Sequence, residues 1–139
     1  QSLIDRMTAS RARLRALADR LSDDELARPL GNGWTAAAEL AHLAFWDRRA
    51  TLLLDRWAKE GISPSPIDVD AMNGALLPQW LLLPPRAAVT DALAAAEEVD
   101  ARIATLSDDL AASIAEGGVR LDRSHHRTAH LDELERFFS

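Results

Sequence analysis

The sequence predicts an all-α fold, a four-helix bundle, and three observations support this. Four stretches of the 139-residue chain repeat large apolar residues at spacings of three, four or seven, as a helix with one buried face does. Capping residues, glycines and prolines separate these stretches. No segment alternates convincingly between apolar and polar residues as a half-buried strand would, although 119–121 is a candidate short extended piece.

The predicted helices carry recognisable signals at their ends. We place them at residues 2–21, 35–60, 84–106 and 124–138. Thr35 is the expected N-cap of the second helix, and Gly61 ends it. Pro84-Pro85 opens the third, because a missing N–H costs little in the first helical turn. Gly117-Gly118 breaks the chain before the fourth.

The connections between these helices have patterns of their own. Ser22-Asp23-Asp24-Glu25 is a capping box that predicts a short helical turn, and Ser107-Asp108-Asp109-Leu110 resembles it. Residues 62–83 form a long crossover, in which a linker precedes a short helix disturbed by Pro78. With so long a connection, the second and third helices need not be antiparallel neighbours. The apolar residues at 76–83 are expected to cover the core, and a second subunit is the alternative.

Composition excludes several classes of protein. With 22 acidic and 16 basic side chains the net charge is -6, so we expect no nucleic-acid partner. The chain has no cysteine, which excludes disulfides, thiolate nucleophiles, zinc ribbons and iron–sulfur clusters. No signal peptide or membrane span is visible, and we expect a cytoplasmic protein without a membrane partner. Length and composition predict a single domain over residues 1–139.

Histidines are the candidate metal ligands. His126 and His130 have i, i+4 spacing, which places their Cβ atoms on one helical face about 6 Å apart. His125 points about 100° away from His126. His42, on the second helix, is the other histidine and the candidate third ligand; the alternatives are surface or capping histidines and a hydrogen-bonded core histidine. Three neutral imidazoles leave coordination positions open, as catalytic sites do. They accept Zn, Ni, Fe, Co or Cu, and of these we expect Zn or Ni, with Fe and Co as alternatives.

Three other residues are candidates for substrate binding. Trp46 and Arg49 follow His42 by four and seven positions, so they share its helical face. The alternative is a core tryptophan with an arginine that extends to solvent. Asn73, in the crossover, either caps a turn or binds a ligand. Glu39 is expected to be exposed near the helix start, and the alternative is a carboxylate that orients the His42 ring.

Two motifs resemble a known family. Gly33-Trp34-Thr35 followed by the run at 39–47 resembles the signature of the DinB-like proteins, and the run at 126–131 matches their H-x-x-x-H element. The resemblance covers most of the chain and includes the Pro-Pro start of the third helix. It implies an up-down-down-up bundle, often dimeric, with a divalent metal on His42, His126 and His130. The related mycothiol-dependent maleylpyruvate isomerases share the bundle and a histidine-rich metal site.

The resemblance also implies a function. We expect a divalent-metal-dependent enzyme that acts on a small molecule, as a transferase or isomerase with a low-molecular-weight thiol cosubstrate, or as a hydrolase. The expected assembly is a homodimer. The alternative is a metal- or ligand-binding bundle without turnover.

Overall fold

The computed structural model describes residues 1–116 and 120–139, and all elements in these ranges are helices. They are α1 (Leu3–Arg20), α2 (Asp23–Leu26), α3 (Ala36–Glu60), α4 (Val69–Trp80), α5 (Pro85–Ala104), α6 (Asp108–Glu116) and α7 (Ser124–Phe137). The predicted all-α class is confirmed. The predicted break at Gly117-Gly118 and the first residue of the candidate extended piece lie outside the described residues.

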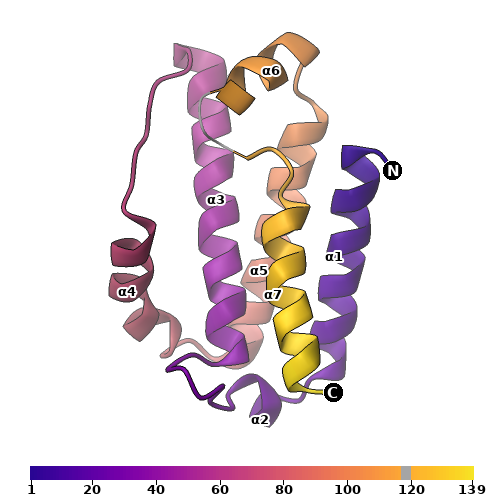
Figure 1. Cartoon of the computed structure of the whole chain (residues 1–139), viewed down its shortest axis with the longest axis vertical. Helices are drawn as coiled ribbons and strands as arrows, with labels where there is room; N and C mark the ends of the chain where they lie inside the picture. Colours follow the sequence, from indigo (N-terminus) through magenta and orange to yellow (C-terminus); the bar gives the residue numbers. More distant parts are fainter. Residues whose placement is uncertain (117–119) are drawn as a thin grey trace.

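Four of the helices, α1, α3, α5 and α7, are long and lie side by side (Figure 1). The most extensive packing is between α3 and α5, followed by the contacts of α1 with α7 and α5. The short helices α2 and α6 lie at opposite ends of the long ones, and α4 runs along the outer side of α3 (Figure 1). Within the described ranges, no helix is both long and apolar enough to cross a membrane.

Local signals explain where the helices begin and end. The Thr35 hydroxyl accepts a hydrogen bond from the Ala38 N–H at 3.1 Å, and Gly61 ends α3 with a φ of +86°. The predicted capping box of α2 is present, with Ser22 and Glu25 bonded reciprocally.

Two details differ from the prediction. The helix after Pro84 ends at Ala104, and Ser107 then caps a separate nine-residue helix, α6. In α4 the helix continues through Pro78 to Trp80, because proline near the end of a helix removes only one backbone hydrogen bond.

The core consists of two apolar clusters stacked along the long helices. One lies beside the start of α3 and includes Leu40, Leu43, Ala92 and Leu131. The other lies toward the far end of α3 and includes Met7, Trp57, Val99 and Ile114. The crossover covers the first cluster through Trp80, which is buried, whereas Leu82 is 83% exposed. The core-covering role expected of residues 76–83 therefore holds for only part of that segment.

A buried charged cluster fastens α7 to the other long helices. The Arg127 guanidinium, 1% exposed, donates to Asp100 on α5 at 2.9 and 3.1 Å and to Asp47 on α3 at 3.3 Å. Asp47 also accepts from Arg123 at 2.9 Å, and Asp100 accepts from Arg11 on α1 at 2.7 Å. This cluster sets the position of α7 relative to α3, and thereby of the histidines on the two helices.

Candidate metal centre

Three histidines from two helices converge on one point. His42 on α3 meets His126 and His130 on α7, and nitrogen atoms of all three lie within 4.8 Å of one another. The Nε2 atoms of His42 and His126 are 2.9 Å apart. His125 lies outside this group, with its side chain 69% exposed beside Asp122. The structure thus brings together the three histidines predicted as ligands and separates the fourth from them.

Asn73 fixes the orientation of His42. Its Oδ1 accepts a hydrogen bond from the Trp46 indole N–H at 2.9 Å and lies 3.2 Å from His42 Nδ1. Because the indole N–H can only donate, the Asn73 oxygen must face both rings, and His42 Nδ1 is therefore the protonated nitrogen. The lone pair of His42 is left on Nε2, the atom that faces His126. A hydrogen bond of this kind is what a metal-binding histidine usually has at its other nitrogen.

Burial keeps two of these imidazoles uncharged. Burial is the main cause that lowers the pKa of His42 to about 4 and that of His126 to about 3, with smaller contributions from His130 to both and from His42 to His126. Arg123 and Arg127 add to the effect on His126. Both rings are therefore neutral at pH 7 and can act as ligands without first losing a proton. With an ordinary histidine pKa, metal affinity would fall below about pH 6.5. For these two residues we expect that fall at lower pH.

Unpaired polar atoms beside the cluster show that the donor set suits a cation. His130 Nδ1 and Glu39 Oε2 are buried, have no hydrogen-bond partner among the described residues, and lie 3.8 Å apart. Such atoms are costly to leave unsatisfied. Two nitrogens that face each other at 2.9 Å also need a proton or a metal ion between them. Three imidazoles with an adjacent carboxylate therefore fit a divalent ion of the zinc or nickel type.

Glu39 is buried, whereas the sequence predicted that it would be exposed. It is 3% exposed, because α7 packs across the start of α3 and brings His130 and Glu133 to it. These three residues form a second candidate group of ligands, which shares His130 with the first. Partial desolvation beside Glu39, together with the Glu39 charge, raises the pKa of the Glu133 carboxyl, although the residue as a whole is exposed. The predicted solvent exposure of Glu39 is therefore wrong, and its carboxylate lies beside His130, whereas Asn73 holds the His42 ring in the way the alternative expected of Glu39.

The histidines open into a pocket of about 390 Å³. Its lining residues are Asn32, Trp34, Glu39, His42, Val69, Asn73, His126, His130 and Glu133. Aromatic rings surround His42 on its other sides, with the Trp34 and Trp80 ring centroids 5.6 and 5.5 Å away. Sequence reasoning missed these two tryptophans as neighbours of His42, because they come from the loop before α3 and from the crossover. The pocket is of a size that holds a small molecule.

Two of the predicted substrate-binding residues lie beside the pocket, and one lies farther away. Asn73 lines it and Trp46 holds Asn73, whereas Arg49 lies in a neighbouring cavity. Seven residues of α-helix span about 10 Å, so sharing a face with His42 does not bring Arg49 to the same pocket. Arg49 instead packs over the Trp46 ring, with its guanidinium carbon 5.8 Å from the ring centroid.

Comparison with known proteins supports the resemblance of the two motifs. The family model of the DinB superfamily matches residues 6–131. Neither the curated proteins nor the solved structures gave a match. The matched range contains all three converging histidines and covers most of the chain. The chain therefore belongs to the DinB superfamily.

Proposed function

We propose that this protein is a divalent-metal-dependent enzyme acting on a small molecule, with His42, His126 and His130 as the metal ligands. The convergence of three imidazoles at the wall of a pocket carries the proposal. A divalent ion held there would supply a Lewis acid that lowers the pKa of a coordinated water or thiol. We favour Zn or Ni, because imidazole suits both.

The chain's own residues would have distinct roles in this site. Asn73 keeps the His42 Nε2 lone pair directed at His126, and Trp46 holds the Asn73 amide in place. Glu39 and Glu133 place carboxyl groups at the pocket wall, where a carboxyl group can accept or donate a proton. Trp34 and Trp80 shield the His42 ring from solvent.

The proposal includes a thiol cosubstrate for a transferase or isomerase reaction. The chain has no cysteine, so a sulfur nucleophile would have to arrive as a small molecule. A thiol bound to a divalent ion becomes a thiolate, which is the reactive form. Hydrolysis by metal-bound water is the variant that needs no cosubstrate.

Other features of the proposal concern the whole molecule. We infer one domain over residues 1–139, with α1, α3, α5 and α7 in an up-down-down-up four-helix bundle; the contacts of α3 with α5 and of α1 with α7 support this. We also propose a cytoplasmic homodimer without a nucleic-acid or membrane partner. The net charge of -6 supports the absence of nucleic acid, and the three consecutive exposed leucines at 81–83 suit an interface between subunits.

Cobalt substitution tests the catalytic form of the proposal. We expect Co²⁺-loaded protein to show d–d absorption that changes when 2-mercaptoethanol is added, together with a new sulfur-to-metal charge-transfer band. Ethylene glycol is the matched ligand without sulfur, and His125→Ala is the matched variant with an intact site. If the thiol gives no charge-transfer band at saturation while cobalt stays bound, the proposal of a thiol cosubstrate is wrong. If no added ligand changes the spectrum, the site is a non-catalytic one.

A further inference from the structure

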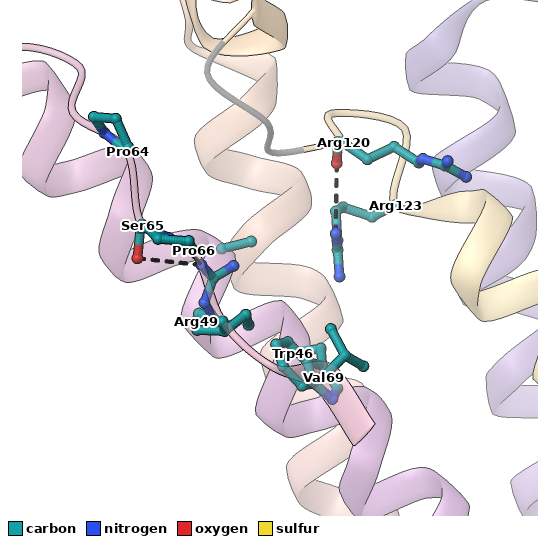
Figure 2. A pocket seen from close by; sticks show the side chains of 10 residues that line it. Trp46, Arg49, Pro64, Ser65, Pro66, Val69, Arg120 and Arg123 are labelled. Atoms are coloured by element: carbon teal, nitrogen blue, oxygen red, sulfur yellow. Dashed lines mark hydrogen bonds between the residues drawn. The ribbon is translucent and has the colours of Figure 1, made fainter. Parts of the chain in front are cut away.

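A second cavity adjoins the histidine pocket on the side of the crossover. It has a volume of about 470 Å³ and lies between α3, the segment at 64–69 and the backbone before α7 (Figure 2). Trp46 and Val69 stand at its boundary: Val69 lines both cavities, and Trp46 lines this one while bonding Asn73 in the other. A molecule in this cavity therefore lies next to the proposed metal site.

The described residues that line the cavity carry positive charge, and none of them is acidic. Its charged lining residues are Arg49, Arg120 and Arg123. Figure 2 shows the Arg120 side chain directed away from Arg49, so that Arg120 takes part through its carbonyl oxygen, which accepts from Arg123 at 3.5 Å. The guanidinium groups of Arg49 and Arg123 are the cationic groups directed at this space.

These two arginines differ in how their charge is balanced. Arg123 is paired with buried Asp47 at 2.9 Å. Arg49 forms no ion pair with a described residue, and its guanidinium donates to the backbone oxygen of Ser65 at 2.8 Å and to the Ser65 hydroxyl at 3.3 Å. Burial and, after it, the Arg123 charge lower the pKa of Arg49, in keeping with a positive charge that no described carboxylate offsets. An anion would supply the missing charge.

The surroundings of Arg49 restrict its movement. Its guanidinium stacks over Trp46 and bonds to Ser65, which stands between Pro64 and Pro66. Proline fixes its own φ and restricts the residue before it, so the backbone that holds Arg49 is stiff. A guanidinium held in one orientation loses little conformational entropy when it binds a planar or tetrahedral oxyanion.

We infer that this cavity is an oxyanion-binding subsite, in which Arg49 and Arg123 bind the carboxylate or phosphate group of a small molecule. Assigning that molecule as the substrate or cosubstrate of the histidine site rests on the proposed function, whereas the binding of the oxyanion does not. The anionic group would lie beyond Trp46, and the reacting part of the molecule would reach past Val69 toward His42.

A titration of the metal-free protein with inorganic phosphate tests this, with acetate in a parallel titration and ionic strength held constant. We expect saturable NMR shifts of the Trp46 indole N–H and the Arg49 Nε–H. Comparing the two anions shows whether the subsite prefers phosphate or carboxylate. We expect Arg49→Gln to weaken the preferred anion about tenfold, because it removes a charge-assisted hydrogen bond.

Arg48→Gln is the matched control. Arg48 is the preceding residue of α3, but it pairs with Asp91 on α5 and does not line the cavity. We expect this variant to bind the anion within about twofold of the unchanged protein, because exposed ion pairs are weak and screened. Both variants should keep the helical circular dichroism of the original.

The outcomes separate this inference from the proposed function. If neither anion gives saturable shifts, or if the Arg48 and Arg49 variants weaken binding equally, the subsite is disproved. If only metal-loaded protein binds phosphate, the anion is a metal ligand, which overturns the subsite and leaves the metal centre standing. Failure of the histidines to bind metal does not change the titration of the metal-free protein.

Discussion

Replacing Arg127 with methionine should remove a large part of the stability of the fold. Its guanidinium is 1% exposed and bonds to Asp100 and Asp47, whose side chains are 3% and 5% exposed. Breaking a buried ion pair by removing one partner typically costs about 3–5 kcal/mol, because the other charge stays buried. Here Asp47 keeps Arg123 and Asp100 keeps Arg11, so we expect the lower end, about 3 kcal/mol.

Urea denaturation followed by circular dichroism measures this loss. A thermal scan of the same proteins gives a second measure, because for a chain of this length a loss of about 3 kcal/mol corresponds to a fall in the melting temperature of roughly 12 °C. Arg102→Met is the matched control, because Arg102 on α5 forms exposed ion pairs with Asp55 and Glu98. If Arg127→Met is no more destabilising than Arg102→Met, our account of the cluster is wrong.

The same variant should have an altered response to pH. Burial already raises the pKa of Asp47 despite its two arginine partners. Removing Arg127 raises the folded-state pKa further above the unfolded value, so the variant binds protons more readily when folded. The cost of the substitution should therefore shrink as the pH falls from 7 toward 5. A cost that grows over this range would contradict the assignment.

Two further predictions concern protonation. The pKa values of His42 and His126 are lowered to about 4 and about 3, so these two rings gain few protons between pH 6 and 5. The logarithm of the metal dissociation constant should therefore rise by at most about one per pH unit over this range. Calorimetric titrations that give a slope near three would contradict this. The second concerns Arg13, whose hydrogen bonds lower the pKa of Glu135 below its usual value of 4.5 and join α1 to α7. The stability from these bonds is present above pH 4.5 and is lost as the pH falls through the folded-state pKa of Glu135. Arg13→Gln should therefore remove part of the loss of stability in acid, as measured by urea denaturation at several pH values. At pH 7 the substitution should cost at most about 1 kcal/mol. Arg15→Gln, on the exposed side of α1, should behave like the original chain, and equal acid sensitivity of all three proteins would refute the role of Arg13.

Local patterns were enough to predict most helix ends. Thr35 and Gly61 act through hydrogen bonds and backbone angles that involve only their near neighbours, and both ends of α3 were predicted correctly. The α6 helix was not predicted as a separate element, because a nine-residue segment shows too few turns for a clear period.

Spacing predicted only part of the candidate site, and His42 was added as the remaining histidine of the second helix. The pair His126 and His130 follows from one helical turn, whereas the burial of Glu39 depends on how α7 crosses α3. The Arg127 cluster joins residues from four helices, and in the sequence each of these charges reads as an ordinary surface residue. Pairings of this kind depend on packing between helices, which periodicity does not specify.

The metal content of single histidine variants tests the central claim most directly. Each variant, His42→Ala, His126→Ala and His130→Ala, should be purified, dialysed against limiting Zn²⁺ and analysed by elemental mass spectrometry, with His125→Ala as control. We predict one ion per chain in the original and in the control, and loss of stoichiometric metal in the other three with helical circular dichroism retained. If any of those three still holds one ion per chain with unchanged affinity, that histidine is not a ligand and the proposed centre is wrong.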